Sequence, residues 1–247
     1  MLNLAQKIMD GDLHKGGLKT LSIKKAENFS AIKEECLKIY ENFNSSDVTS
    51  RSHRTYWTNP YGKANQWDLW NTNGKFDSNE GIGIKHIKNK KFHYHDQFPS
   101  LGKFIDSIPD KINFRLNLLK PGSGLGQHEE QIVEKYQKKP FVRVRFHLPI
   151  QTNDLSNVFL DGEWFHYEEG NIYFFNNGCV HCAENNGTTD RLHLVWDCVL
   201  TQRIYNFLKD GSSVSNVKVE NVNPKYARMK RFVPVIDADK LWIPKSI

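Results

Sequence analysis

The run Phe141-Val-Arg-Val-Arg-Phe-His-Leu148 alternates between apolar and polar side chains from Val142 onward. Successive side chains of an extended strand point to opposite faces of a sheet, so this run predicts one apolar face and one face that carries Arg143, Arg145 and His147. Such a strand lies either in a sheet whose polar face meets water or in a barrel with a polar interior. The alternation alone leaves both possibilities open.

Other segments share this period of two. Residues 112–118 alternate in the same way, and residues 171–176 and 191–200 also have strand character. In the last run, Arg191, His193 and Asp197 share one face. Several short strands separated by turns predict a mainly β, antiparallel fold of the sandwich or barrel type. Ahead of them, residues 26–43 place apolar side chains at every third or fourth position, which predicts a helix.

The composition is typical of a folded globular protein. The chain has 247 residues, of which 38% are hydrophobic and 12% aromatic, and this argues against disorder. The formal net charge of +6 would favour an acidic partner. However, the only dense basic cluster is Lys225–Arg231, which we interpret as a solvated tail rather than a nucleic-acid site.

The sequence also predicts a compartment. No apolar run reaches the length of a membrane-spanning helix, and the first residues lack the features of a secretory signal. We therefore expect the four cysteines to be reduced and the protein to be cytoplasmic, without membrane association. Cys179 and Cys182 have no second pair that would indicate a zinc ribbon. The oligomeric state is left open.

The run Gln127-His-Glu-Glu130 contains a His-x-Glu motif. In an extended segment, His128 and Glu130 point the same way and could hold one metal ion. A distant histidine would complete a two-histidine, one-carboxylate site, which suits non-haem iron(II) with open coordination positions. The alternative is that a helix begins at Glu129 and runs to Tyr136, so that both glutamates only complement a helix N-terminus.

Four motifs follow one another in the second half of the chain. The turn Pro121-Gly122 leads to His128, and the Arg-x-Arg-x-His strand at 143–147 follows. The run Tyr167-Glu-Glu-Gly-Asn-Ile-Tyr-Phe-Phe-Asn-Asn-Gly-Cys-Val-His181 comes next, and Arg191 stands ten residues after its histidine. In order and spacing, these motifs resemble the aspartyl/asparaginyl β-hydroxylase family, which includes the bacterial cis-proline hydroxylases.

The resemblance spans about residues 112–201, and it has departures. Asn176 and Asn177 stand where the family has an acidic pair. Glu130 stands where the proline hydroxylases carry an aspartate and the animal members carry no carboxylate. This chain therefore looks closer to the proline hydroxylase branch.

The resemblance implies a double-stranded β-helix, which is a cupin-like jelly-roll, with iron(II) inside. We expect a single oxygenase domain over residues 1–247. Its helical N-terminal support would cover 1–79, its jelly-roll core about 80–202, and its C-terminal extension 203–247. The implied metal ligands are His128, Glu130 and His181. The implied 2-oxoglutarate site comprises Arg191 at the 5-carboxylate, Asn117 as its helper, and Arg145 and His147 near the other end.

The expected function is that of an iron(II)- and 2-oxoglutarate-dependent dioxygenase. It would use O2 to hydroxylate a C–H bond of a free amino acid, a small derivative or an Asp/Asn-type residue of a peptide, with release of succinate and CO2. The alternatives are a cupin-like metal-dependent isomerase or hydrolase and a non-catalytic jelly-roll binding protein. Residues 50–75, with loop composition and three tryptophans, are predicted to close over the substrate. Substrate contacts stay unassigned.

Overall fold

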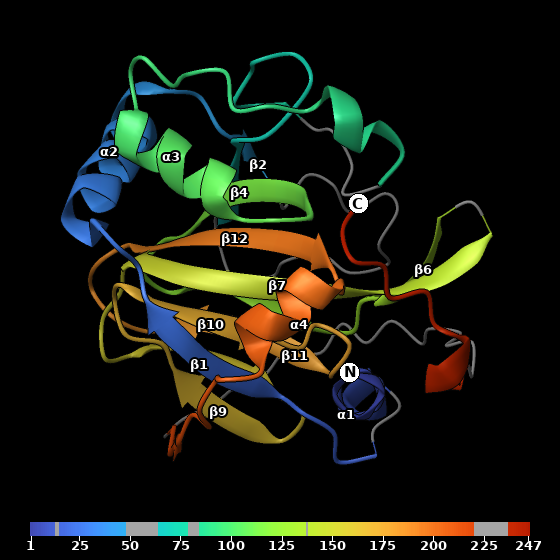
Figure 1. The fold of residues 1–247 in the computed structure, drawn as a ribbon. Helices are drawn as coiled ribbons and strands as arrows, with labels where there is room; N and C mark the ends of the chain where they lie inside the picture. Colours follow the sequence, from blue (N-terminus) through green and yellow to red (C-terminus); the bar gives the residue numbers. More distant parts are fainter. Residues whose placement is uncertain (13–14, 48–63, 79–83, 137, 220–236) are drawn as a thin grey trace.

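The computed structural model shows a barrel of antiparallel strands with helices on one side (Figure 1). It describes residues 1–12, 15–47, 64–78, 84–136, 138–219 and 237–247. The described helices are α1 (Leu2–Asp12), α2 (Phe29–Asn42), α3 (Pro99–Ser107) and α4 (Gln202–Leu208), with 3-10 turns η2 (Ile84–Asn89) and η3 (Ala238–Lys240). None of these helices is both long and apolar enough to cross a membrane.

Two antiparallel sheets form the barrel. In the described residues, the larger sheet runs β1 (Thr20–Lys25), β10 (Asn171–Phe175), β7 (Lys139–Gln151), β12 (Arg191–Val199), β4 (Lys111–Leu119), β3 (Ala64–Asp68) and β2 (Ser46–Asp47), with β6 (Val133–Tyr136) on β7. The smaller sheet runs β13 (Asn216–Val217), β9 (Glu163–His166), β8 (Ser156–Leu160), β11 (His181–Asn185) and β5 (Ser123–His128). The predicted mainly β, jelly-roll fold is confirmed.

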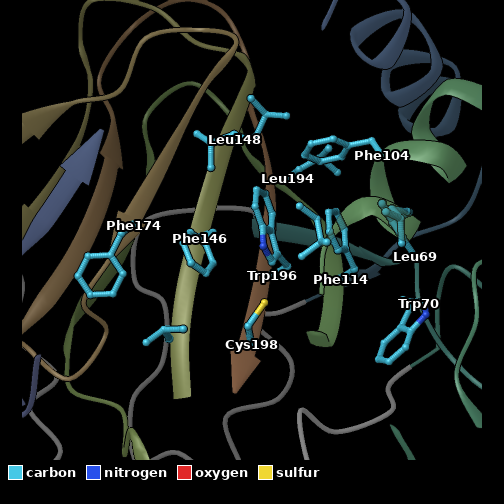
Figure 2. Packing of buried hydrophobic residues seen from close by; sticks show 14 of the residues in the cluster. Leu69, Trp70, Phe104, Phe114, Phe146, Leu148, Phe174, Leu194, Trp196 and Cys198 are labelled. Atoms are coloured by element: carbon cyan, nitrogen blue, oxygen red, sulfur yellow. The ribbon is translucent and has the colours of Figure 1, made fainter. Parts of the chain in front are cut away.

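The apolar face of the larger sheet packs against the helices. Trp196 of β12 stacks on Phe114 at 5.0 Å and on Phe146 at 5.6 Å between ring centroids. Phe104 of α3 meets Trp196 edge to face at 5.7 Å (Figure 2). Because the helices cover this face, the polar face that carries Arg145 turns toward the smaller sheet. The packing therefore selects the barrel with a polar interior.

A second apolar cluster lies between the two sheets and lines part of that interior. The larger sheet contributes Ala64, Leu119, Tyr173 and Phe175, and the smaller sheet contributes Val158, Leu160, Phe165 and Ala183. These side chains exclude water from one side of the barrel, so the charged groups on the other side interact in a medium of low dielectric constant.

The N-terminal part of the chain does more than support the barrel. The helix predicted over 26–43 is confirmed as α2, although it begins only after Asn28, whose left-handed backbone (φ 54°) cannot continue a helix. The segment 1–79 also supplies the strands β1, β2 and β3. β1 pairs with β10 and brings Thr20 opposite Phe175. The large sheet thus extends beyond the predicted core.

The jelly-roll core was predicted to begin at about residue 80, but η2 and α3 occupy the stretch that follows, and the next strand, β4, begins at Lys111. In α3, Leu101, Phe104 and Ile105 recur at helical spacing and are buried.

Two sequence predictions fall wholly or partly on residues outside the described set. Most of the 50–75 segment, including Trp57, lies there, and so does the basic cluster Lys225–Arg231. Trp67 and Trp70 are described, and both are buried in the main core.

Candidate metal and cosubstrate site

A cavity of about 160 Å³ lies between the two sheets. Every residue that the sequence analysis assigned to the metal or the cosubstrate lines it: Asn117, His128, Glu130, Arg145, His147, His181 and Arg191. β4 supplies Asn117, β7 supplies Arg145 and His147, and β12 supplies Arg191, while His128 comes from β5 and His181 from β11. Groups from distant parts of the sequence therefore converge on one buried space.

Three candidate metal ligands meet at one end of the cavity. His128 ends β5 and His181 begins β11, and the two are direct partners in the strand register. Oε1 of Glu130 lies 4.0 Å from Nε2 of His128 and 3.8 Å from Nε2 of His181. Among the His, Cys, Asp and Glu side chains that the structure describes, this is the one group of three or more close enough to hold a metal ion.

Backbone carbonyls orient both histidines. Nδ1 of His128 lies 2.7 Å from the carbonyl oxygen of Gly126, and Nδ1 of His181 lies 2.9 Å from that of Cys179. A carbonyl only accepts hydrogen bonds, so the proton is on Nδ1 and the lone pair on Nε2. This is how metal-binding histidines are commonly held. Burial and the neighbouring His181 lower the pKa of His128 to about 3, which keeps it neutral, as a ligand must be.

The helix alternative for Glu129 and Glu130 is wrong. Residues 129–132 have no regular structure, and Val133–Tyr136 form β6, which pairs with β7. No helix N-terminus exists at this point for the two glutamates to complement. A hydrogen bond of 3.0 Å from the backbone N–H of Glu130 to the carbonyl of Asn177 fixes the segment beside the loop that leads to His181.

An ion-pair network surrounds the Glu130 carboxylate. Arg145 donates to both of its oxygens, and Arg143 donates to Oε2 at 3.2 Å. Both arginines also bind Asp197, which is fully buried on β12. Burial opposes ionisation of Asp197, but Arg145 and Arg143 hold its pKa well below the usual range. The same two arginines keep Glu130 ionised, again against the effect of burial.

Arg191 has very different surroundings. It is 3% exposed, and it has no carboxylate within ion-pair distance in the described part of the chain. Its Nη2 donates to Nδ1 of His193 at 3.0 Å, while its Nε is buried without a partner. Burial lowers the pKa of Arg191 to about 10, so it stays charged at neutral pH. A buried, unpaired cation is costly, and its presence indicates an anionic ligand.

Two further polar groups in the cavity lack partners among the described residues. These are Oδ1 of Asn117 and Nε2 of His147. Nδ1 of His147 lies 3.4 Å from Nδ1 of His193, which itself accepts from Arg191. A row of polar atoms thus leads from Arg191 toward Arg145 and the metal ligands. This donor set fits a ligand with a carboxylate at each end, as 2-oxoglutarate has.

A family model described as aspartyl/asparaginyl beta-hydroxylase matches residues 26–200. The chain belongs to this family. It is accordingly a non-haem iron hydroxylase with iron(II) as cofactor and 2-oxoglutarate as cosubstrate. A search of curated protein sequences found no match.

Three solved structures illustrate what this hydroxylase is similar to. A 2OG-Fe(II) oxygenase family oxidoreductase from Burkholderia pseudomallei is 12% identical, with 79% of this chain and 90% of that chain covered and a TM-score of 0.43. HygX from Streptomyces hygroscopicus, solved with nickel and 2-oxoglutarate bound, is 10% identical, with 82% of this chain and 93% of that chain covered and a TM-score of 0.43. A Pseudomonas putida prolyl-4-hydroxylase is 16% identical, with 79% of this chain and 98% of that chain covered and a TM-score of 0.41.

The structure adds site residues that sequence reasoning did not assign. Arg115 lines the cavity, Asp197 anchors both arginines of β7, and Asn177 donates to Glu130 at 3.2 Å. A signal for Arg115 was present, because it stands two residues before Asn117 on the same face of β4. For Asn177 the departure from the family pattern was visible, but its partner Glu130, 47 residues away, was not.

Proposed function

We propose that this family member hydroxylates a small amino acid, an amino-acid derivative or an Asp/Asn-type residue. Its iron(II) would be held by His128, Glu130 and His181, and its 2-oxoglutarate by Arg191. One observation carries the proposal. The His–Glu–His cluster and a buried arginine without an acidic partner line the same cavity.

When bound, iron(II) with 2-oxoglutarate and O2 supplies the oxidising power that converts a C–H bond to C–OH, with release of succinate and CO2. The side chains of this protein bind and orient. Arg191 offers a planar pair of donors to the 5-carboxylate, and Asn117 lies nearby on β4. Arg145 and His147 stand between Arg191 and the metal ligands, where they would orient the other end of the cosubstrate.

The apolar walls would keep water away from the reacting groups. Leu125, Val158 and Val195 line the cavity beside the charged residues. Exclusion of water strengthens the pairing of Arg191 with a carboxylate. We favour a free amino acid or a small derivative over a bulky substrate, because the metal ion and the cosubstrate would share this cavity of about 160 Å³ with it.

A turnover assay tests this function. The purified protein is stripped of metal, and succinate is measured with 2-oxoglutarate in air after addition of iron(II) or zinc(II). We expect succinate with iron(II) only, and its loss on chelation. Absence of iron-dependent succinate would contradict the proposal and favour a cupin-like isomerase or hydrolase, or a binding protein.

A further inference from the structure

Arg115 lies in the same cavity but has no role in the proposed function. It projects from β4, and its side chain is 14% exposed. In the strand register, Val195 of β12 is the partner of both Arg115 and His147. Arg115 and His147 therefore lie in one row across the sheet, with Val195 between them. The side chain of Arg115 lines the cavity together with His147 and Asn117.

The pairing of Arg115 is incomplete. Its closest acidic atom is Oδ2 of Asp197, at 3.6 Å, which is too long for a hydrogen bond. That oxygen already accepts hydrogen bonds from Asn113, Arg143 and Arg145 at 2.7–3.1 Å. The Nε atom of Arg115 is buried and has no partner among the described residues. Asp197 is thus committed elsewhere, and Arg115 retains donors for another group.

The balance of charges in the site also favours an anionic ligand. Arg191 lines the cavity by itself, and the other ionised groups belong to one ion-pair network that reaches the cavity: Arg115, Arg143, Arg145, Glu130, Glu134 and Asp197. Four cations face three anions, which leaves one positive charge. Iron(II) adds two positive charges and 2-oxoglutarate adds two negative charges, so the loaded site keeps an excess of one. A carboxylate group held within the cavity would offset it locally.

We propose that Arg115 binds a carboxylate of the substrate, so that the site takes a small carboxylic acid, such as an amino acid with a free carboxyl group. This inference rests on the proposed function, because it assigns Arg191 to 2-oxoglutarate. A guanidinium matches a carboxylate with two parallel hydrogen bonds. A carboxylate placed at Arg115 supplies the negative charge that this incompletely paired guanidinium lacks. Arg115 would then determine which end of the substrate enters beside Val195.

The experiment compares acids with their neutral amides. Succinate release by the iron-loaded wild type is measured first without substrate, which tests the proposed function by itself. The twenty free L-amino acids and their C-terminal amides are then added in turn. We expect at least one acid to stimulate release, and its amide to need about tenfold higher concentration or more, because one charged hydrogen-bonded contact is lost.

Variants test whether Arg115 causes the preference for an acid over its amide. In Arg115→Gln the acid and its amide should act within about threefold of each other, and Arg115→Lys should recover part of the preference because it keeps the charge. Lys103→Gln removes one positive charge outside this cavity and should keep the wild-type preference. The rise in Tm of each variant with nickel(II) and 2-oxoglutarate checks that the barrel is folded.

Several outcomes would overturn the inference while the proposed function stands. These are basal succinate release that no acid stimulates, equal use of acids and amides by the wild type, or an undiminished acid preference in Arg115→Gln. An Arg115→Gln protein that keeps the preference but needs over tenfold more 2-oxoglutarate would place Arg115 in the cosubstrate site instead. Absence of basal succinate would count against the proposed function itself.

Discussion

Two buried arginines in this barrel have opposite surroundings, although both project from neighbouring strands of one sheet. Arg145 on β7 is bound by Glu130 and Asp197, so its charge is balanced within the protein. Arg191 on β12 has only the neutral His193 as a hydrogen-bond partner among the described side chains. At the residue scale, Arg145 therefore holds other residues of the site in place, whereas Arg191 is free to bind an anionic ligand.

Replacement of Arg191 tests that distinction. Loss of one partner of a buried, charged hydrogen bond costs about 2–5 kcal/mol. Arg191→Ala should therefore raise the 2-oxoglutarate concentration for half-maximal succinate release by tens to thousands of fold. Arg191→Lys should recover part of the affinity, since it restores the charge without the planar pair of donors. An unchanged 2-oxoglutarate requirement in Arg191→Ala would show that the anchor lies elsewhere.

Glu130 and Glu129 form a matched pair of neighbours. Glu130 belongs to the candidate metal cluster, whereas Glu129 does not. Glu130→Ala should weaken binding of iron(II), or of nickel(II) as a stable probe, and nearly abolish succinate release. Glu129→Ala should leave both largely intact. Thermal shift during metal titration measures metal binding, and the turnover assay measures succinate release, for both variants. Near-normal turnover in Glu130→Ala would place this chain in the branch with two histidine ligands.

Asn177 gives a physical reason for one departure from the family pattern. Its amide Nδ2 donates to Oε2 of Glu130 at 3.2 Å, and it is 1% exposed. A carboxylate at this position, as the family pattern has, would stand against the Glu130 carboxylate and repel it. The amide at 177 is therefore compatible with the glutamate at 130.

At the scale of elements, a side chain of helix α2 caps the N-terminus of helix α3. α3 begins after Phe98, which provides no side-chain cap. Glu35 of α2 accepts hydrogen bonds from the backbone N–H groups of Ser100 at 3.1 Å and Leu101 at 2.7 Å. The carboxylate thus satisfies two donors of the first turn and opposes the positive end of the helix dipole. It also fixes the packing of α2 against α3, which covers the apolar face of the large sheet.

Removal of this cap should destabilise the protein. We expect Glu35→Ala to lower the free energy of unfolding by about 1–2 kcal/mol, as the loss of a helix cap does. Urea unfolding of the metal-free wild type and variant measures this change in the free energy of unfolding. Glu34→Ala is the control, because Glu34 is exposed and pairs only with Lys38 on the same helix. Equal losses in the two variants would show that the interhelical cap contributes nothing.

At the scale of the whole molecule, Asp197 connects strands that lie far apart in the sequence. It binds Asn113 of β4 together with Arg143 and Arg145 of β7, and those arginines hold Glu130 beyond the end of β5. The network joins both sheets at the metal end of the cavity. Because Asp197 is fully buried, removal of its charge would leave two arginines partly uncompensated.

The contribution of Asp197 should depend on pH in a defined direction. We expect Asp197→Asn to lower the free energy of unfolding by about 3–5 kcal/mol near neutral pH. The pKa of Asp197 is depressed in the folded state, so its stabilisation is present above the unfolded-state value of about 3.9 and is lost as the pH falls below it.

Urea unfolding of the metal-free wild type and of Asp197→Asn from pH 3 to pH 8 measures this difference. It should be constant above about pH 5 and should shrink below about pH 4. A difference that stays the same down to pH 3 would contradict a depressed pKa.

The sequence by itself determined the fold class and the main chemistry. Alternation marks the strand at 141–148, and the order of the motifs around His128, His181 and Arg191 points to a jelly-roll with iron and 2-oxoglutarate. These signals are readable because side-chain periodicity is a local property and because motif spacing reflects which strand ends meet. The metal and cosubstrate assignments stay predictions, although the structure brings their residues around one cavity.

Only the tertiary structure decided which charges compensate one another. Asp197 shares a face of β12 with Arg191, yet it binds Arg145, which lies 52 residues away and faces it in the strand register. That pairing leaves Arg115 incompletely paired, and Arg191, at the other end of β12, has no carboxylate partner among the described residues. The inclusion of β1 in the large sheet, beside β10, also depended on distant contacts. Electrostatic pairing follows distance in space, and distance in space is set by strand register rather than by position along the chain.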